Sequence, residues 1–350
     1  MRVFCYFVEP AGYTIDLINN IYKKKGIPYC FLYDTSFARS RNFSENEIFL
    51  SRCNFIEKIG FIFKVWKNND LIIINGYNNY PFILTFLLNL FGWNKRYIAV
   101  ESDTQLVIPS NYLKRIIKAL YLSFIFDNKF ILGFAGGNNT HKDLFSYYGM
   151  SESSIFLMPM MVNNSRFYIS NKKRPNTFTF LYVGRLEKHK GVKQLIEQFN
   201  IKFHDKDAIL KIIGSGNHEQ YLKSRFESNK VIFVGKKIDE ELIKEYHSAS
   251  CFVCPSLFEP WGLVINEALS SSLPVISTVN VGANFDLILD KKTGFISKNM
   301  DEFGDNMFEL YNNNELIDKF SNNGFNLMSQ YWNYSLYSDC LEKVFQSLDI

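Results

Sequence analysis

Residues 258–268 read FEPWGLVINEA and follow an apolar run, Cys251–Cys254, that has the composition of a buried strand. A Pro-Ser pair ends that run, and a helical pattern begins at Gly262. Strand, loop and helix in this order form the repeating unit of a doubly wound α/β domain. The stretch therefore predicts such a domain, with Glu259 in the loop before the helix and Glu267 more than one turn inside it.

The start of this predicted helix combines an anion site with two carboxylates. The backbone N–H groups of Gly262, Leu263 and Val264 open the helix, where they have no partner inside it and the helix dipole favours an anion. Glu259 comes before these amides and Glu267 after them. Because a carboxylate can accept two hydrogen bonds from a diol, the pattern predicts a diphosphate with a sugar on each side. That is the chemistry of a nucleotide-sugar.

A second strand and loop, residues 178–191, read FTFLYVGRLEKHKG. Gly184 permits a tight turn and lets a ligand approach the backbone. Arg185 presents a planar fork to phosphate oxygens, and Lys190 adds a mobile point charge. Charged loop residues are often merely solvated, but their combination with the acidic stretch favours a diphosphate site. A helix is expected to follow from Val192.

The two motifs resemble those of the retaining family 4 glycosyltransferases, also called glycosyl transferases group 1. The Glu-x7-Glu spacing matches the family signature, and residues 184–191 match its G-R-L-x-x-x-K-G motif. The resemblance implies that Glu259 holds the donor sugar and Glu267 the ribose, while Arg185 and Lys190 hold the diphosphate. It further implies donor contacts at these positions: Gly12, Gly184, Gly214, Gly235, Ile238, Gly262, Leu263 and Val264.

The same resemblance implies an activity. We expect transfer of a sugar from a nucleotide-sugar, with UDP-sugars favoured, to a hydroxyl of a glycan or a lipid-linked acceptor, with retention of the anomeric configuration. Such transferases act in bacterial surface polysaccharide, lipopolysaccharide or glycolipid synthesis. Two alternatives stay open, namely a nucleotide-sugar 2-epimerase of the same fold and a non-catalytic nucleotide-sugar-binding protein. The sequence disfavours a nicotinamide dehydrogenase, because residues 9–14 lack the G-x-G-x-x-G pattern.

Strands and helices alternate on both sides of a polar, basic segment, residues 171–177. This pattern predicts two doubly wound, Rossmann-like α/β domains, and the resemblance implies the GT-B architecture with a cleft between them. We expect an acceptor-side domain over 1–170 and a nucleotide-sugar-binding domain over 178–328. Residues 329–350 are expected to form a helical tail that crosses back to the first domain.

Two carboxylates are catalytic candidates in the first domain. Arg96–Val100 has strand character, and Glu101 and Asp103 follow it. The carboxyl ends of parallel strands face the ligand crevice in doubly wound sheets. Some members of the family carry a His or Asp in this region, and residues 1–140 contain no His. Asp103, then Glu101, is therefore the candidate for binding the acceptor hydroxyl, and capping of the next helix is the alternative role for Asp103.

The charge distribution and the apolar segments of the chain limit the kinds of partner that it can bind. The net charge of +4 divides unevenly, because residues 1–168 carry 18 Lys and Arg against 12 Asp and Glu. Two apolar segments bordered by cations, 82–93 and 116–126, predict either core helices or helices that lie on an anionic membrane. Both are shorter than the ~20 residues of a spanning helix. We expect a cytoplasmic protein, with a peripheral position on the inner membrane face as an option, and no nucleic-acid partner.

No cofactor or metal is expected, because two cations and a helix start can neutralise a diphosphate. Cys251 and Cys254 have the spacing of half a zinc site, but no second pair completes it. They also fall inside a predicted strand. The better interpretation is two small core residues.

Overall fold

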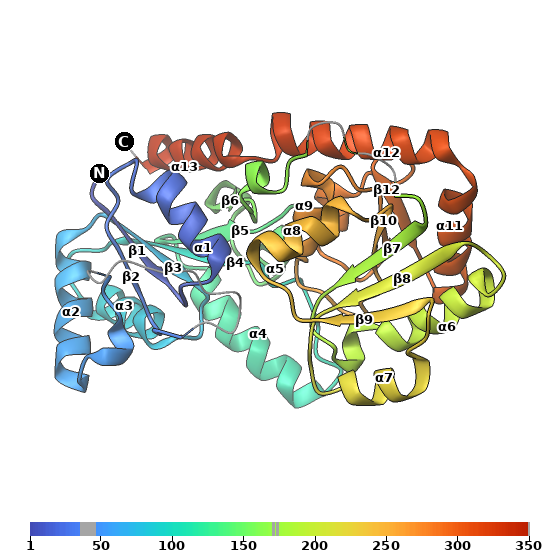
Figure 1. The fold of residues 1–350 in the computed structure, drawn as a ribbon. Helices are drawn as coiled ribbons and strands as arrows, with labels where there is room; N and C mark the ends of the chain where they lie inside the picture. The colour runs from blue at the N-terminus through green and yellow to red at the C-terminus, as the bar shows by residue number, and fades with distance from the viewer. Residues whose placement is uncertain (36–46, 170–171, 173–174, 349–350) are drawn as a thin grey trace. The chain divides into compact units, whose positions relative to one another are not determined.

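The computed structural model describes residues 1–35, 47–169, 172 and 175–348. The chain forms two compact units (Figure 1). Unit 1 consists of Met1–Met161 together with Tyr334–Ile350, and unit 2 consists of Val162–Asn333. Both units are doubly wound α/β domains, which confirms the predicted fold class.

Unit 1 is built on a parallel sheet with the strand order β2-β1-β3-β4-β5-β6. Its strands are almost continuous apolar runs, as expected for a parallel sheet covered on both faces, and the four residues Leu71–Ile74 are fully buried. The strands are β1 (Val3–Phe7), β2 (Tyr29–Phe31), β3 (Leu71–Asn75), β4 (Tyr97–Ser102), β5 (Ile131–Ala135) and β6 (Ile155–Leu157). The helices are α1 (Gly12–Leu17), η1 (Ile18–Tyr22), η2 (Leu50–Arg52), α2 (Phe55–Asn68), α3 (Tyr80–Phe91), α4 (Tyr112–Phe126), α5 (Thr140–Tyr147), η3 (Glu152–Ser154) and α13 (Tyr334–Leu348).

Asparagine side chains begin the helices α2, α3 and α4. The side chains of Asn54, Asn79 and Asn111 each accept a hydrogen bond from a backbone N–H of the first turn. These contacts satisfy donors that a helix start leaves unpaired. The helix that follows Asp103 thus has Asn111 as its cap, and the capping role considered for Asp103 is wrong.

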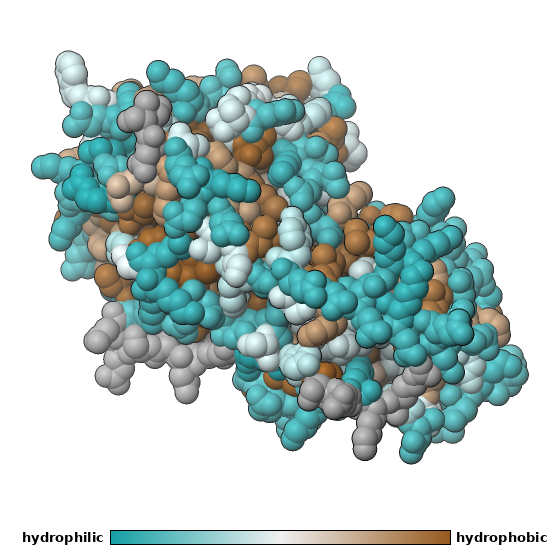
Figure 2. All heavy atoms as spheres, turned by 90° about the horizontal axis from the view of Figure 1, so that it is seen from above, coloured by the Kyte–Doolittle hydropathy of each residue, from teal (hydrophilic) through white to brown (hydrophobic). Residues whose placement is uncertain are grey.

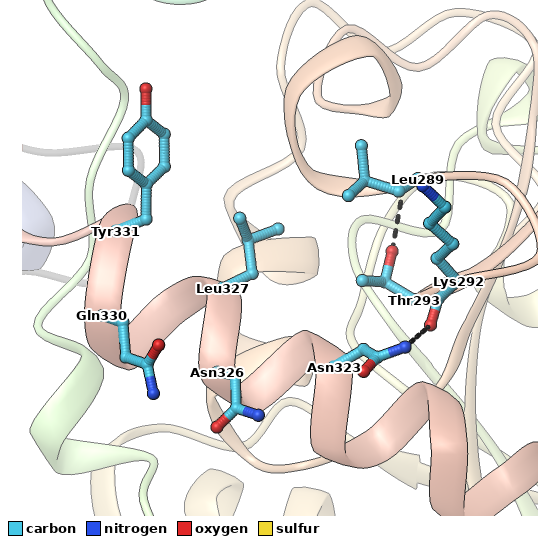
Figure 3. A pocket seen from close by; sticks show the side chains of 8 residues that line it. All are labelled: Leu289, Lys292, Thr293, Asn323, Asn326, Leu327, Gln330 and Tyr331. Carbon is cyan, nitrogen blue, oxygen red and sulfur yellow. Dashed lines mark hydrogen bonds between the residues drawn. The ribbon is translucent and has the colours of Figure 1, made fainter.

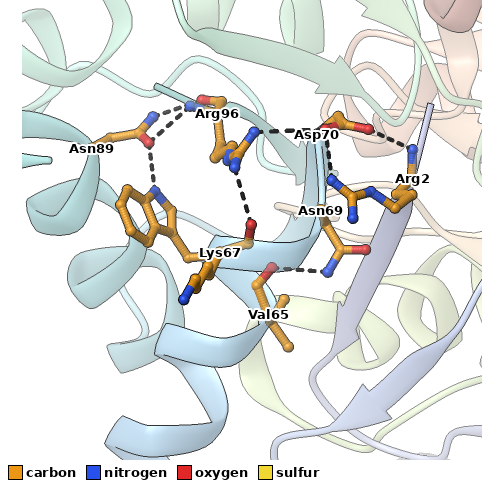
Figure 4. A network of polar contacts seen from close by, with 8 residues as sticks. Arg2, Val65, Lys67, Asn69, Asp70, Asn89 and Arg96 are labelled. Carbon is orange, nitrogen blue, oxygen red and sulfur yellow. Dashed lines mark hydrogen bonds and ion pairs between the residues drawn. The ribbon is translucent and has the colours of Figure 1, made fainter. Parts of the chain in front are cut away.

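A buried polar network fixes α2 and α3 at the amino ends of β3 and β4 (Figure 4). The indole Nε1 of Trp66 donates to Oδ1 of Asn89 at 2.9 Å, and Nδ2 of Asn89 donates to the carbonyl of Arg96 at 2.6 Å. The guanidinium of Arg96 donates to the carbonyl of Lys67 and lies 3.6 Å from Asp70. These hydrogen bonds join both helices to the segment before β4, so the network defines how the helices lie on the sheet.

Unit 2 has a second parallel sheet, with the order β12-β11-β10-β7-β8-β9. The strands are β7 (Phe178–Val183), β8 (Ala208–Ile213), β9 (Val231–Gly235), β10 (Cys251–Cys254), β11 (Val275–Thr278) and β12 (Gly294–Ser297). The helices are η4 (Asn164–Arg166), η5 (Lys188–Lys190), α6 (Val192–Phe203), α7 (Glu219–Phe226), α8 (Asp239–His247), α9 (Leu263–Ser270), α10 (Asn284–Leu287), α11 (Met300–Asn312), α12 (Asn314–Asn326) and η6 (Leu327–Tyr331). The sheet order places the loops after β10, β7, β8 and β9 side by side.

The division between the units falls at Met161, before the linker expected at 171–177, of which residues 171, 173 and 174 lie outside the described residues. The reason is that the segment after Met161 packs on unit 2. Nδ2 of Asn164 donates to the carbonyls of Met328 and Trp332 at 2.8 and 2.9 Å. The chain returns to unit 1 at Tyr334, where α13 begins.

Hydrophilic side chains cover most of the face shown in Figure 2, with hydrophobic side chains in smaller areas between them. In the described parts of the chain, no helix is both long and apolar enough to cross a bilayer.

Candidate functional site

Four neighbouring loops meet at the carboxyl ends of β10, β7, β8 and β9 in unit 2. The N–H of Gly184, after β7, donates to the carbonyl of Ile213 at 3.0 Å, and the N–H of Gly214, after β8, donates to the carbonyl of Gly235 at 3.0 Å. The N–H of Leu257, after β10, donates to the carbonyl of His189 at 2.8 Å. These backbone contacts hold the sequence-predicted loops against one another.

Two of the loop glycines allow this close packing. A Cβ atom on Gly214, whose φ is +142°, would lie 1.8 Å from the carbonyl oxygen of Gly184. A Cβ atom on Gly191, whose φ is +70°, would lie 2.0 Å from the carbonyl oxygen of Pro255. Any other residue would both strain the backbone and push the loops apart.

The loop before α9 has the predicted geometry. Gly262 precedes the helix with φ +100° and ψ +64°, and no side chain in the described part of the chain caps the helix start. Trp261 is buried, donates from Nε1 to Oδ1 of Asn266 at 2.8 Å, and stacks on Trp332 with ring centroids 5.6 Å apart. Trp261 therefore anchors the loop, and among the described residues no side chain caps the first N–H groups of α9, those of Leu263 and Val264.

Lys190 and Glu259 form an ion pair between Nζ and Oε2. Lys190 is almost completely buried, and the side chain of Glu259 is 17% exposed. The backbone fixes Glu259 as well, because its N–H donates to the carbonyl of Asn280 and its carbonyl accepts from Gly282, both at 3.0 Å. The sequence predicted a role for each residue separately, whereas the structure brings the cation and the carboxylate into direct contact.

Arg185 differs from Lys190 in its surroundings. Its side chain is exposed, and its carbonyl accepts a hydrogen bond from the hydroxyl of Tyr182 at 2.8 Å. Within the described chain, its guanidinium makes no ion pair or hydrogen bond. The backbone is thus held in place while the charged fork remains available to a ligand.

Glu267 has a partner that the sequence did not reveal. The hydroxyl of Tyr246, in α8, donates to Oε2 of Glu267 at 2.7 Å. Tyr246 is fully buried, so this hydrogen bond orients a carboxylate in the second turn of α9. No local pattern around Tyr246 marks it as a site residue, since its ring also belongs to the apolar face of α8.

Gly235 and Ile238 lie beside these loops. Gly235 ends β9 with φ +80°, and Ile238 is exposed immediately before α8. Three acidic residues form the first turn of α8, and Arg166 pairs with the first of them, Asp239, at 3.0 Å. A planar ligand beside Ile238 would therefore contact an apolar side chain at the edge of the loop cluster.

Cys251 and Cys254 are buried in β10. Burial raises the pKa of the Cys254 thiol to about 12 and that of Cys251 well above its usual value, so both are protonated near neutral pH. Among the described residues no group of three or more His, Cys, Asp or Glu could hold a metal ion. An Asp-x-Asp triplet, residues 205–207, precedes β8 and lies at the opposite end of the sheet from the glycine loops.

The remaining predicted residues lie in unit 1. Gly12 is the first residue of α1. Glu101 is the second-to-last residue of β4, and Asp103 directly follows the strand. Both line a cavity of about 570 Å³ that is also lined by Tyr337 of α13. The predicted residues thus form two groups, a larger one in unit 2 and a smaller one in unit 1.

Two further cavities of unit 2 contain none of the predicted residues. One of about 360 Å³ lies between the 289–293 loop and the α12–η6 segment (Figure 3), where Nδ2 of Asn323 donates to the carbonyl of Lys292 at 2.8 Å. Another of about 750 Å³ is lined by residues at the amino ends of β7 and β10, among them Phe178 and Ser250. Neither adjoins the glycine loops.

Comparison with known proteins bears on this arrangement. Residues 164–327 match the family model described as glycosyl transferases group 1. This segment belongs to the group 1 glycosyltransferases. It includes all of the loops and charged residues predicted in unit 2.

Individual relatives agree with this assignment. An uncharacterized glycosyltransferase of Methanocaldococcus jannaschii is 35% identical over 118 residues, which are 33% of this chain and 30% of that protein. The capsular polysaccharide biosynthesis glycosyltransferase CapM of Staphylococcus aureus is 27% identical over 237 residues, 65% of this chain and 57% of CapM. The match thus spans between about a third and somewhat more than half of these relatives.

A solved structure extends the likeness to the whole chain. HepE of Anabaena, in a crystal structure with UDP, has a TM-score of 0.78 and 16% identity, and the superposition covers 99% of this chain and 100% of HepE. At this identity the likeness concerns the fold alone. The whole chain therefore shares the fold of HepE, in agreement with the GT-B architecture that the resemblance implied.

Proposed function

We propose that this protein transfers a sugar from a nucleotide-sugar to an acceptor hydroxyl, with retention of the anomeric configuration. The observation that carries the proposal is the buried ion pair of Lys190 and Glu259 at the start of α9. A cation, an oriented carboxylate and a helix start that no described side chain caps lie at one edge of the sheet of unit 2. Phosphoryl oxygens and sugar hydroxyls are the groups that such a set binds.

In this scheme the chain's own residues stabilise the leaving group. Arg185, Lys190 and the first N–H groups of α9 bind the diphosphate and stabilise the negative charge that develops as the glycosidic bond breaks. Glu259 orients the donor sugar, and Glu267, held by Tyr246, orients the ribose. These groups neutralise the diphosphate without a metal ion, so we expect transfer to be independent of divalent cations.

A UDP-sugar is the donor we favour, since HepE has been crystallised with UDP and with UDP-glucose. A role in surface polysaccharide or glycolipid synthesis is supported by CapM, a capsular polysaccharide enzyme, and by WaaB, a lipopolysaccharide outer core galactosyltransferase of similar fold. The acceptor would then be a glycan or a lipid-linked sugar.

A thermal-shift screen against UDP-, GDP- and ADP-sugars tests this proposal. A ligand at a concentration of 100 times its Kd stabilises the native state by about 2.7 kcal/mol. The nucleotide-sugars of one nucleobase should therefore raise the Tm clearly more than those of the other two. A flat response across the panel would contradict the proposal. Analysis of the products without an acceptor separates the alternatives: an epimerised donor indicates the 2-epimerase, and binding without turnover in the presence of any acceptor indicates a binding protein.

We also propose that unit 1 docks on an anionic membrane through α4. Four apolar side chains along α4 are more than half exposed, namely Leu113, Ile117, Leu120 and Phe124. Lys114 and Arg115 lie between them in the sequence and are also exposed. Each cation near an anionic surface contributes about 1 kcal/mol, which salt screens. Lys118 is less available, because its Nζ donates to the carbonyl of Val107 at 2.8 Å.

Vesicle co-sedimentation provides the measurement. We expect binding to phosphatidylcholine vesicles that contain phosphatidylglycerol, weaker binding at high salt, and loss of most binding in Lys114→Gln/Arg115→Gln and in Leu113→Ser/Leu120→Ser. Lys223→Gln/Arg225→Gln, on the surface helix α7, removes the same charge and should bind like the wild type. Equal binding of all variants, or no binding to anionic vesicles, would favour a soluble acceptor instead.

A further inference from the structure

The loop before α9 packs on a tryptophan from a distant part of the chain. Trp261, between Glu259 and Gly262, stacks on Trp332 with the ring planes 15° apart, and both side chains are almost completely buried. Both residues belong to unit 2. Trp332 nevertheless lies beyond the segment 164–327 that matches the family model. The largest side chain of the loop is thus fixed by a residue outside that segment.

Polar contacts hold Trp261 as well. Its Nε1 donates to Oδ1 of Asn266 in α9, and Asn266 is fully buried. Since an indole has a single N–H donor and no acceptor, this bond satisfies its hydrogen-bonding capacity. The carbonyl of Trp261 accepts a hydrogen bond from the N–H of Ala283 at 3.0 Å. Stacking on Trp332 adds an apolar contact to these two polar ones.

The segment that ends at Trp332 also packs along α9. A Cβ atom on Gly324, in α12, would lie 2.7 Å from Cδ2 of Leu269, so α12 and α9 are in close contact. Oγ of Ser270, the last residue of α9, donates to Oδ1 of Asn164 at 3.2 Å. The Nδ2 atom of Asn164 in turn donates to two carbonyls of the α12–Trp332 segment. Contacts of this segment therefore hold α9 at both of its ends.

We propose that Trp332 is a positioning residue of the donor site. The proposal rests on the nucleotide-sugar site proposed at the start of α9. Glu259 precedes Trp261 and the first N–H groups of α9 follow it, so a displaced indole would move the carboxylate and the helix start together. Such groups must be held to within about 0.5 Å by the residues that support them. Trp332 thus acts on nucleotide binding through Trp261.

Removal of the ring at position 332 should weaken nucleotide binding. The stabilisation of an aromatic pair corresponds to roughly two- to tenfold in an equilibrium constant. We expect Trp332→Leu to raise the Kd for UDP by about this factor. Trp332→Phe keeps a ring that can stack on Trp261 and should raise the Kd less. Isothermal titration calorimetry with UDP, or with the nucleoside diphosphate selected by the donor screen, measures both variants.

Loss of a large buried side chain also lowers the stability of the fold, so the effect on binding needs a matched control. Phe320→Leu removes a fully buried ring from α12, where it packs on Phe295 with ring centroids 5.2 Å apart. This variant should also lower the Tm, because it too leaves a cavity in the core. It should leave the Kd for the nucleoside diphosphate at the wild-type value.

Hydrogen exchange at the indole N–H groups gives a second readout, which needs no nucleotide. Protein labelled with ¹⁵N at its four tryptophans gives one indole signal for each, and single Trp→Phe substitutions assign these signals. We expect exchange at Trp261 to be faster in Trp332→Leu than in the wild type or in Phe320→Leu, because the loop opens locally. The indole of Trp66, which donates to Asn89 in unit 1, should exchange at the same rate in all variants.

Nucleotide binding and positioning of the loop are coupled in both directions. If Trp332 favours the conformation of the loop that binds the nucleotide, the nucleotide must favour the same conformation. Saturating nucleoside diphosphate should therefore slow exchange at the Trp261 indole in the wild type. Unchanged exchange on binding would contradict the coupling.

Further results would overturn the inference. Wild-type affinity in Trp332→Leu is one, and a loss of affinity no larger than that in Phe320→Leu is another. Exchange at Trp261 that rises equally in these two variants would show that Trp332 is only a core residue. If Trp332→Leu does not fold, Trp332→Phe decides, and wild-type affinity with wild-type exchange in that variant would refute the positioning role. Absence of nucleoside diphosphate binding by the wild type would instead contradict the proposed function, while the exchange comparison would still show whether Trp332 holds the loop.

Discussion

Arg185→Ala is expected to lower kcat/KM by about one to two orders of magnitude, because a hydrogen bond to a charged group contributes roughly 1.5–3 kcal/mol. The backbone of Arg185 is fixed by Tyr182, and its side chain is exposed, so the loss should be confined to the ligand contact. Lys190→Ala should have the larger effect. It removes a buried cation and leaves the Glu259 carboxylate, 17% exposed, without that partner. We therefore expect Lys190→Ala also to destabilise the fold by about 1–3 kcal/mol.

Steady-state kinetics and thermal unfolding measure the two effects separately. Lys188→Ala is the matched control, since Lys188 lies in the same loop with an exposed side chain and should behave like the wild type in both assays. Far-ultraviolet circular dichroism should be the same for all variants. Wild-type turnover in Arg185→Ala or Lys190→Ala would remove that residue from the diphosphate site.

Most of unit 2 could be predicted because its signals are local. Apolar runs with β-branched residues mark β7, β8, β9 and β10, and a glycine follows or ends most of them. The Pro-Trp-Gly sequence before α9 indicated both the end of the loop and the start of the helix. The spacing of Glu259 and Glu267 then placed one carboxylate on each side of the helix start without any long-range information.

Side-chain partners could not be predicted, because they depend on the strand order. Lys190 meets Glu259 only because β10 pairs with β7, and Tyr246 reaches Glu267 only because α8 and α9 are neighbours in space. The contact of Tyr337 with Glu101 joins opposite ends of the chain. The hydrophobic periodicity of the sequence contains no information about contacts between such distant residues.

The two apolar, cation-bordered helices illustrate the same limit. From the sequence, 82–93 and 116–126 were equivalent candidates for core or membrane. The structure separates them: α3 buries Phe82 and Phe86 against the sheet, whereas α4 buries only its last turns, at Leu122, Ile125 and Phe126. The amphipathic pattern alone could not show that the buried residues of α4 all lie in its second half.

Glu259 and Glu267 are expected to bind different parts of the donor. If Glu267 holds the ribose, Glu267→Gln should weaken binding of the free nucleoside diphosphate and of the nucleotide-sugar alike, by roughly tenfold for one charge-assisted hydrogen bond. If Glu259 holds the donor sugar, Glu259→Gln should leave nucleoside diphosphate binding close to that of the wild type and impair transfer. Tyr246→Phe, which frees the Glu267 carboxylate from its hydrogen bond, should follow Glu267→Gln in a weaker form.

Isothermal titration calorimetry with UDP, or with the nucleoside diphosphate selected by the donor screen, measures this directly on the wild type, Glu259→Gln and Glu267→Gln. We predict binding by the wild type, nearly unchanged affinity in Glu259→Gln and clearly weaker affinity in Glu267→Gln. The reverse order of the two variants, or no binding of any nucleoside diphosphate by the wild type, would contradict a nucleotide-sugar site at the start of α9.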